Sequence, residues 1–242
     1  MKAAYIEKHG GPDVLQYGDL PDPCAGPGEV VVDIHAASVN GADWKVRSGA
    51  SGAVSHFPYI LGRDFSGVVS AVGVKVEDLK IGDAVFGVCD IGQEGAYAGK
   101  IAVKSEILAK KPDSLSHMEA ASLALIGLTA LVSIEDTLRL RPDETILIQG
   151  GAGGVASFAI QLAKHIGARV ITTASAANHA YLRDLGADEI IDYMVQDFAE
   201  RAPDCDAVFE TVGGDVAQRS FAVLKLGGRA AFIASGPNAP EP

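Results

Sequence analysis

Cysteine is scarce in this sequence, and its three residues are widely separated. Cys24, Cys89 and Cys205 stand far apart in a chain of 242 residues. An odd and sparse set of this kind forms no disulfide framework and contains no paired-cysteine metal motif. We therefore expect three reduced thiols that act as small buried apolar side chains.

Basic residues and long apolar runs are also scarce. The chain has 20 Lys and Arg against 31 Asp and Glu, a net charge of -11. This balance argues against nucleic acid or an anionic membrane as the main partner. The longest apolar run, residues 120–134, is too short to span a bilayer and predicts a buried helix. The first ten residues lack the apolar core of a signal peptide. We expect a cytoplasmic protein without a nucleic-acid or membrane partner.

The two halves of the chain differ in pattern. Residues 1–114 contain short Val- and Ala-rich segments separated by Gly, Pro and Asp, for example 29–39, 65–73 and 83–88. Short strands at this spacing predict an all-β barrel or sandwich. Residues 115–242 alternate strand-like and helical segments, which predicts a doubly wound parallel sheet. The expected fold class is therefore α/β, with a β domain at 1–114 and an α/β domain at 115–242.

A glycine-rich loop follows the first strand of the second half. In "ILIQGGAGGVASFAI", residues 146–160, Gly151, Gly153 and Ala156 fit the pattern G-x-G-x-x-G/A. The loop follows a buried strand and opens a helix, which is the context that a dinucleotide-binding motif requires. The first glycine would make the tight turn, the second would let a pyrophosphate approach, and the third small residue would let helix and strand pack closely.

The start of that helix would supply free N–H groups to the phosphates. The predicted contacts of the cofactor here are Gly151, Ala152, Gly153, Gly154, Val155 and Ala156. A tight turn without a ligand is the alternative, but such a turn needs one or two glycines and not four.

The end of the next strand bears on the choice between NAD and NADP. An NAD site has an acidic residue about 20 positions on, bound to the ribose 2′-hydroxyl. In "VITTASAANH" that region holds Thr172, Thr173 and Ser175, and the next carboxylate is Asp184. Hydroxyls would accept a 2′-phosphate that a carboxylate would repel, so the pattern favours NADP.

Other side chains would complete a 2′-phosphate site. Asn178 is a neutral donor in the same stretch, and no Arg or Lys lies within 172–180. His179 and the phenol of Tyr193 are the predicted substitutes for a cationic clamp. Helix N-capping by the Ser and Asn residues is the alternative, and the two roles can coexist.

Several segments together resemble one enzyme family. They are "SVNGADWKVRSG" (38–49), "FPYILGRDFSGVVSAVG" (57–73), "GLTAL" (127–131), the glycine loop and "ETVGGD" (210–215), in this order. The chain resembles the medium-chain dehydrogenase/reductase superfamily in its quinone oxidoreductase, or zeta-crystallin-like, branch. The resemblance implies a GroES-like β domain, a Rossmann domain and a nicotinamide bound in the cleft between them. It also implies hydride transfer from NADPH.

The ligands of the zinc-dependent members are missing. Those members carry Cys where this chain has Asn40, and Gly-His-Glu where it has Gly62, Arg63 and Asp64. An amide and a guanidinium bind zinc poorly or not at all. Their four-cysteine lobe has no counterpart either, because Cys89 stands alone between 83 and 106. We therefore expect no metal site, with a structural ion pair between Arg63 and Asp64 as another interpretation of these two residues.

The absence of a metal favours an already activated acceptor. A quinone or an α,β-unsaturated carbonyl compound spreads the charge of an incoming hydride onto oxygen, so a few neutral donors suffice. By resemblance, Asn40 and Thr129 would lie near the nicotinamide, and Asp43 and Trp44 would line the substrate side. Asn40 as a turn residue, Asp43 as a helix cap and Trp44 as plain core are the alternatives. The resemblance also extends the cofactor contacts to Tyr193, Val212 and Ser235.

The sequence ends at "SGPNAPEP", where the superfamily normally adds a sixth Rossmann strand and returns to the β domain. We expect five strands in the order 3-2-1-4-5, with residues 228–235 as an unprotected edge. Pro237 and Pro240 would discourage the tail from adding a strand. A homo-oligomer is therefore expected. A dinucleotide-binding protein with little or no turnover is the alternative to an NADP-dependent reductase.

Overall fold

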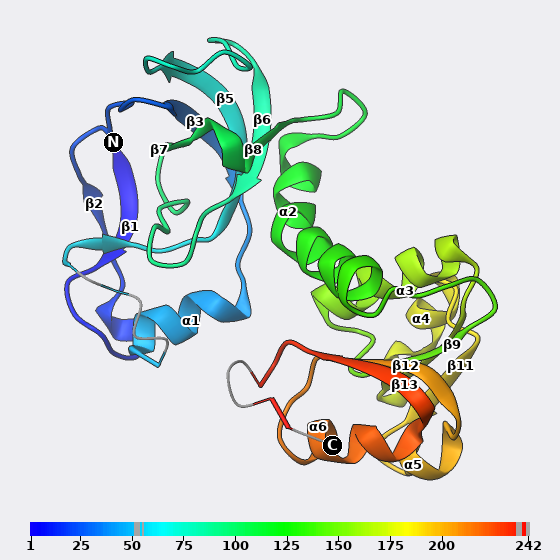
Figure 1. Cartoon of the computed structure of the whole chain (residues 1–242). Coiled ribbons are helices and arrows are strands. Elements are labelled where there is room, and N and C mark those ends of the chain that lie inside the picture. The colour runs from blue at the N-terminus through cyan, green and yellow to red at the C-terminus, as the bar shows by residue number, and fades with distance from the viewer. Residues whose placement is uncertain (51–53, 55, 236–238, 241–242) are drawn as a thin grey trace. The chain divides into compact units, whose positions relative to one another are not determined.

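The computed structural model describes residues 1–50, 54, 56–235 and 239–240, in two compact units, Met1–Leu125 and Ile126–Pro242 (Figure 1). The division falls inside helix α2 (His117–Leu131), whereas the sequence placed it before this helix, at 114/115. Pro237 lies outside the described residues, as do 236, 238, 241 and 242.

The first unit contains two antiparallel sheets, as expected for the β domain. One has the strand order β2-β1-β4 and the other β7-β3-β5-β6-β8. Helix α1 (Gly41–Ser48) follows β3. The strands are β1 (Lys2–Ile6), β2 (Gln16–Asp19), β3 (Glu29–Ala37), β4 (Tyr59–Ile60), β5 (Asp64–Val72), β6 (Ala84–Val88), β7 (Lys100–Lys104) and β8 (Leu108–Lys110).

Strand β5 lies between β3 and β6 and organises the larger sheet. Phe65 and Val69 of β5 are buried in one core with Val30 and Val32 of β3. Gly67 occupies a point where no side chain fits, because a Cβ there would lie 2.1 Å from the Asp33 carbonyl oxygen. A glycine inside a strand thus marks a close approach of two backbones.

The second unit has a five-stranded parallel sheet in the order β11-β10-β9-β12-β13. This is the predicted order 3-2-1-4-5, so the Rossmann expectation is confirmed. The strands are β9 (Thr145–Ile148), β10 (Arg169–Ala174), β11 (Glu189–Asp192), β12 (Cys205–Glu210) and β13 (Leu224–Phe232). The helices are α3 (Gly154–Ile166), α4 (His179–Asp184), α5 (Phe198–Arg201) and α6 (Asp215–Arg219), with short 3-10 turns η4 (Ala176–Asn178) and η5 (Ser220–Val223).

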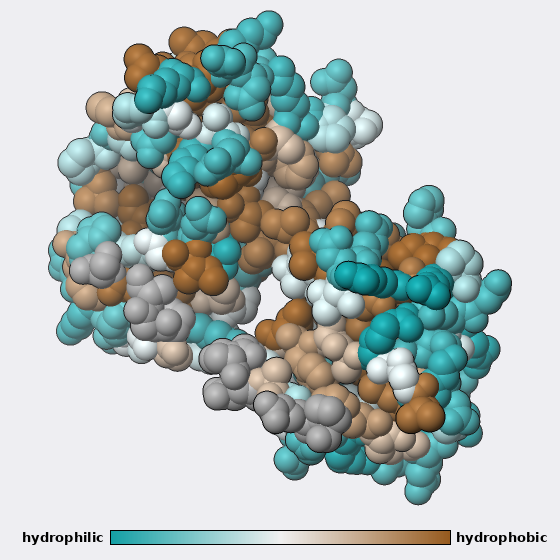
Figure 2. Space-filling model, in the orientation of Figure 1, coloured by the Kyte–Doolittle hydropathy of each residue, from teal (hydrophilic) through white to brown (hydrophobic). Residues whose placement is uncertain are grey.

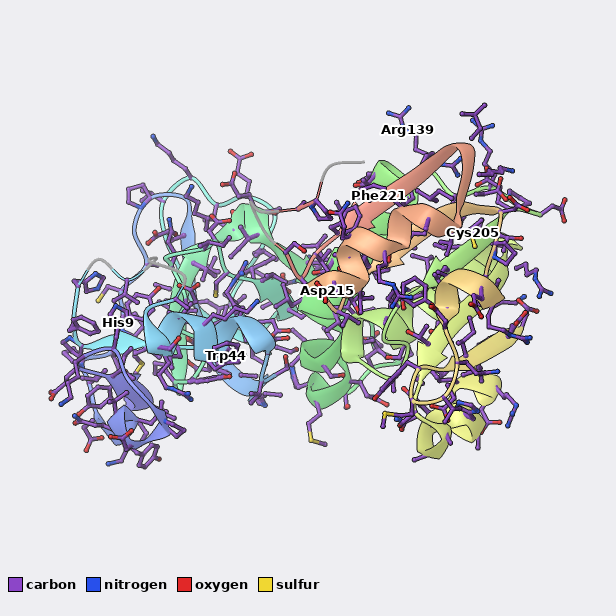
Figure 3. All side chains as sticks on the ribbon, turned by 90° about the horizontal axis from the view of Figure 1, so that it is seen from below. His9, Trp44, Arg139, Cys205, Asp215 and Phe221 are labelled. Carbon is purple, nitrogen blue, oxygen red and sulfur yellow. The ribbon has the colours of Figure 1, made fainter. Side chains whose placement is uncertain are left out.

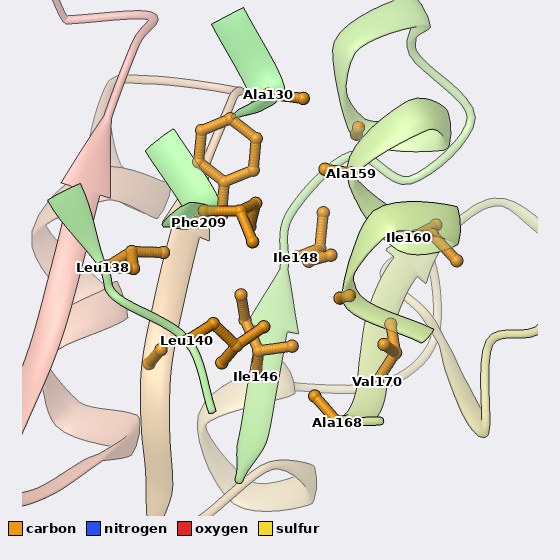
Figure 4. Close-up of a cluster of buried hydrophobic side chains, with 14 of the residues drawn as sticks. Ala130, Leu138, Leu140, Ile146, Ile148, Ala159, Ile160, Ala168, Val170 and Phe209 are labelled. Atoms are coloured by element: carbon orange, nitrogen blue, oxygen red, sulfur yellow. The ribbon is translucent and has the colours of Figure 1, made fainter. Parts of the chain in front are cut away.

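Alternation along β9 buries both faces of this sheet. Ile146 and Ile148 pack with Ala159 and Ile160 of α3 on one face (Figure 4). Leu147 points the other way, into a cluster with residues of α5 and η5. Strands buried on both faces explain the continuous apolar runs in the sequence.

Strand β13 lies at the outer edge of the sheet, next to β12. Its pairing is irregular between Cys205 and Ala207 of β12, and Leu226 is fully exposed. Phe221 lies in the turn that precedes the strand (Figure 3).

Helix α2 continues into a π-helical segment, η3 (Val132–Thr137). Together they form a helix of 21 residues that is long and apolar enough, by length and composition, to cross a membrane. The expectation that this segment is too short to span a bilayer is therefore wrong, because it was based on residues 120–134 and the helix extends beyond them at both ends. Ala120 and Ala121 are buried in the first unit, and Ala130 and Ile134 belong to the core of the second. Met118, Leu128 and Val132 are exposed, so the expectation of a buried helix holds for only part of its surface.

Polar residues cover much of the visible surface of both units. Hydrophobic patches lie between hydrophilic ones on the face shown (Figure 2). The chain thus has the mixed surface expected from its composition, of which 48% is hydrophobic and 21% charged.

Gly67→Ala is expected to destabilise the first unit by about 1–3 kcal/mol, since a core strand would have to shift to admit a methyl group. Gly127→Ala is the control, because a Cβ there would make ordinary contacts with the Phe158 ring at 3.7–3.9 Å. Alanine in a helix also gains about 0.5–1 kcal/mol over glycine. Thermal and urea unfolding followed by circular dichroism would measure both. Equal stability of Gly67→Ala and the wild type would contradict the close approach of β3 and β5.

Candidate functional site

A tight turn joins β9 to α3 and contains the four glycines. Gly150 has a φ of +68°, in the left-handed region that favours glycine. The N–H of Gly153 donates to the Gly150 carbonyl at 2.9 Å and closes the turn. Gly153 is also the N-cap of α3. The turn that the sequence pattern assigned to Gly151 is therefore made at Gly150.

Gly151 serves close packing instead. The residue is buried, and a Cβ there would lie 2.2 Å from Thr172 Oγ1 and 3.2 Å from Ile160 Cδ1. Ala156, in the first turns of α3, is 1% exposed and belongs to the core. These two small residues let the loop and α3 approach the sheet.

Gly153 leaves open space above the loop. The residue is exposed, and a Cβ there would meet Gly150 O at 3.3 Å and no other described atom within 4 Å. Ala152 and Gly154 are exposed too, and Val155 is half-buried. A phosphate group could therefore approach this backbone closely.

The beginning of α3 favours an anion. The first amides of a helix have no intrahelical acceptor, and no side chain of the described residues caps this end. The helix dipole adds partial positive charge there. The exposed turn and this helix end together form an anion site of the kind that binds pyrophosphate.

A cavity of about 410 Å³ lies beside the loop within the second unit. Its wall includes Gly150, Tyr193, Phe198, Val212 and Arg219. The Arg219 guanidinium lies 5.0 Å from the centre of the Phe198 ring and pairs with Asp197 at 2.5 Å. The structure thus brings together Tyr193 and Val212, two predicted site residues, around a space of the size used for small ligands.

The two threonines at the end of β10 have different surroundings. Thr172 is fully buried and donates to the Ile148 carbonyl at 2.6 Å, and Thr173 is 3% exposed. The assignment of Thr172 to the ribose region is therefore wrong. The Thr173 hydroxyl is engaged with Gln149 and the Gly150 N–H beneath the loop, although Thr173 also lines the cavity. Ser175 and Asn178 are half-buried, with Asn178 Nδ2 3.4 Å from Ser175 Oγ. Ser175 occupies the N-cap position of η4, although its side chain makes no capping hydrogen bond.

His179 is less suited to a phosphate than the sequence implied. Its Nε2 atom is buried and has no hydrogen-bond partner among the described residues. Tyr193, by contrast, is 57% exposed. Of the two proposed substitutes for a cationic clamp, the phenol is the accessible one.

A polar cluster in the first unit surrounds Asp64, which is fully buried on β5. Its Oδ1 accepts hydrogen bonds from Ser38 Oγ at 2.7 Å and Asn40 Nδ2 at 2.8 Å. Its Oδ2 accepts the backbone N–H of Leu125 at 3.2 Å. Asn40 Nδ2 also lies 3.0 Å from Ser38 Oγ. Both amide hydrogens of Asn40 are therefore engaged, and its side chain also accepts the Asp43 backbone N–H in a capping box. The amide can offer a ligand only the remaining lone pair of its carbonyl oxygen.

Asp43 caps the start of α1. Its Oδ2 accepts the Asn40 N–H and the Tyr97 hydroxyl, each at 2.7 Å. The side chain is 5% exposed, and burial raises the pKa of Asp43 above its usual value. Its Oδ1 is buried without a hydrogen-bond partner in the described part of the chain. The helix-cap interpretation of Asp43 is therefore what the structure shows.

Trp44 follows on α1 (Figure 3) and is 51% exposed. The alternative that it is plain core is therefore wrong. An exposed indole next to the Asn40 and Asp43 cap is available for contact with a ligand.

Arg63 does not pair with Asp64. Its Nε and Nη2 donate to the Cys89 carbonyl at 3.0 and 2.9 Å, so the ion-pair interpretation is wrong. Burial raises the pKa of the Cys89 thiol to about 12 and that of Cys205 to about 11, which makes both unreactive at neutral pH. Cys24 is exposed, contrary to the expected burial.

Thr129 and Ser235 are the remaining predicted site residues. Both are half-buried in the second unit, Thr129 on α2 and Ser235 shortly after β13. Sequence reasoning missed Gln149, a polar residue with 1% exposure at the end of β9. A polar side chain directly after a buried strand was the available signal.

Comparison with known proteins places both units in one family. Residues 26–113 match the alcohol dehydrogenase GroES-like domain, and residues 154–242 match the zinc-binding dehydrogenase domain. A 2-methylene-furan-3-one reductase from Solanum lycopersicum is 35% identical, over 99% of this chain and 64% of its own. The chain spans about two thirds of the length of such curated relatives.

Two solved structures are close in fold. The quinone oxidoreductase from Coxiella burnetii has a TM-score of 0.90 and 39% identity, covering 94% of this chain and 74% of that one. The Escherichia coli quinone oxidoreductase complexed with NADPH has a TM-score of 0.88 and 31% identity, covering 94% and 71%. With a GroES-like unit and a Rossmann unit that both match, this chain belongs to the medium-chain dehydrogenase/reductase superfamily, in its quinone oxidoreductase branch.

Proposed function

We propose that the chain binds NADPH and reduces a quinone or an α,β-unsaturated carbonyl compound without zinc. The observation that carries this proposal is the exposed backbone at Gly153 and the start of α3, which fits a pyrophosphate. The relatives support it, since two are quinone oxidoreductases, one of them solved with NADPH, and a third is a 2-methylene-furan-3-one reductase. A binding protein with little turnover has no support from these enzymes.

The second unit supplies the groups for NADPH. The pyrophosphate would lie on the exposed part of the loop and the helix start, from Ala152 to Val155, whereas Gly151 and Ala156 pack beneath it. The adenosine would occupy the neighbouring cavity, with Tyr193 and Val212 in its wall. Ser175 and Asn178 are neutral, and the sequence between Ala174 and Ala180 contains no carboxylate that would repel a 2′-phosphate.

When bound, NADPH supplies a hydride for an electrophilic carbon of the acceptor. The chain must then orient both reactants and stabilise negative charge on the acceptor's oxygen. Asn40 is held in one orientation by Asp64 and Ser38 and presents its carbonyl oxygen as an acceptor for an N–H group. Asp43 acts through Asn40, whose backbone N–H it binds. Trp44 and Thr129 would make contacts with substrate and nicotinamide.

The donor set of the first unit supports a reaction without zinc. Where zinc-dependent members have a thiolate and an imidazole, Asn40 carries an amide and Arg63 a guanidinium. Both groups are engaged, Asn40 with Asp64 and Arg63 with the Cys89 carbonyl. A conjugated acceptor needs no Lewis acid, because it delocalises the charge itself.

Gly153→Val is expected to abolish NADPH binding, because the side chain would occupy the space above the loop. The fold should persist, since among the described atoms a Cβ at this position meets one oxygen within 4 Å. Fluorescence titration would measure binding and a thermal melt would monitor folding, with Gly127→Ala as the control. Normal NADPH binding by a folded Gly153→Val variant would show that the phosphates bind elsewhere.

Ser175→Asp is expected to weaken NADPH binding and to leave NADH binding equal or stronger, because a carboxylate would repel the 2′-phosphate. Ser175→Asn is the matched neutral control and should keep the NADPH preference. Titration of each variant with both cofactors tests this. Equal affinities of the wild type for NADPH and NADH would refute the assignment of the 2′-phosphate site.

The purified protein is expected to contain no stoichiometric zinc and to keep its quinone reductase activity in a chelator. Elemental analysis and steady-state assays with and without the chelator measure this. One tightly bound zinc per chain, together with loss of activity on its removal, would overturn the zinc-independent mechanism.

A further inference from the structure

A buried polar network lies beneath the glycine loop. Gln149 at the end of β9, Thr173 on β10 and Ser220 in η5 are between 0% and 3% exposed. Polar groups at this depth are retained only where hydrogen bonds satisfy them. The hydrogen bonds of these three side chains therefore indicate which parts of the structure they hold in place.

Thr173 binds the first two amides of the loop. Its hydroxyl donates to Gln149 Oε1 at 2.8 Å, which uses its single proton. The same oxygen therefore accepts the Gly150 N–H, at 2.9 Å. The Thr173 backbone carbonyl accepts the N–H of Gly151, also at 2.9 Å. One residue thus satisfies two consecutive loop amides from the side of the sheet.

Gln149 determines the direction of these bonds. Ser220 Oγ donates to the Val216 carbonyl at 2.7 Å, so it can accept from Gln149 Nε2, 3.4 Å away. With its nitrogen directed to Ser220, the amide presents Oε1 to Thr173. The Gln149 carbonyl also accepts Thr211 Oγ1 at 2.7 Å. Gln149 therefore connects β9 to β10, to η5 and to the residue that follows β12.

We propose that Thr173 and Gln149 are positioning residues for the pyrophosphate, an inference that rests on the proposed binding of NADPH. By holding the amides of Gly150 and Gly151 toward the sheet, they fix the left-handed turn at Gly150. The turn then presents Gly153 and the first amides of α3 outward. Thr173 and Gln149 act on the cofactor through the loop backbone.

Both residues also line the 410 Å³ cavity, so an effect on the adenosine part must be separated from one on the pyrophosphate. Adenosine 2′-monophosphate makes this separation, because it lacks the diphosphate. The variant Thr173→Val keeps the shape of the side chain but removes the hydroxyl, whereas Thr173→Ser keeps the hydroxyl. Gln149→Met is a second variant of similar size that leaves Thr173 intact.

Isothermal titration calorimetry of NADPH and of adenosine 2′-monophosphate would test the proposal. Thr173→Val is expected to weaken NADPH binding about tenfold, the effect of one lost buried hydrogen bond. The affinity of Thr173→Val for adenosine 2′-monophosphate should stay within about twofold of the wild-type value. Gln149→Met should show the same two results as Thr173→Val. Thr173→Ser should bind NADPH as the wild type does. Hydrogen exchange of residues 149–153 in the cofactor-free protein should quicken in Thr173→Val but not in Thr173→Ser.

The outcomes separate the two proposals. If the wild type binds NADPH and folded Thr173→Val and Gln149→Met bind it equally well, the positioning role is wrong and the proposed function stands. An equal loss for both ligands would assign Thr173 to the adenosine pocket and overturn the inference. A wild-type chain that binds neither ligand would overturn both proposals.

Discussion

The turn between β9 and α3 is the constraint on which the nucleotide unit depends. Within a few residues the backbone leaves a fully buried strand, reverses at the left-handed Gly150 and enters a helix. Two of its amides face the sheet and must be satisfied there, which Thr173 achieves. The following amides face outward at Gly153 and the start of α3, where a phosphate can satisfy them. The same local geometry thus serves stability on one side and binding on the other.

The hydrogen bonds around Asp64 in the first unit likewise serve two purposes, because they satisfy a buried carboxylate and orient a site residue. A fully buried carboxylate is tolerated only with good partners, and Asp64 has a hydroxyl, an amide and a backbone N–H. These contacts orient Asn40, the N-cap of α1, while Asp43 binds its backbone N–H from the first turn. Of the residues at the zinc-ligand positions of related enzymes, Asn40 and Asp64 are bonded to each other, and Arg63 is bonded to the Cys89 carbonyl. Substrate-side chemistry would have to come from oriented neutral groups.

Much of the fold was predictable because it rests on local pattern. The buried strand before the glycine loop and the helix after it were both predicted, and both are present as β9 and α3, because a short apolar run and a helical apolar face are clear local patterns. The division between the units was placed too early, because α2 is one continuous helix whose two ends pack in different cores. Its full length was also missed, because the apolar run 120–134 was counted alone and the helix extends from His117 to Thr137.

The family, the strand order and the location of the glycine loop could be predicted from the chain alone, because they follow from motifs and their spacing. Contacts between distant segments were needed to show which glycine turns and which packs, and that Thr173 binds the loop whereas Thr172 binds the backbone of β9. They also show that Arg63 binds the Cys89 carbonyl and not Asp64. Adjacent residues in a strand and its flanks point in different directions, so a polar residue near a site is not thereby in it. Which way each side chain points depends on contacts with residues distant in sequence, and these exist only once the sheet has formed.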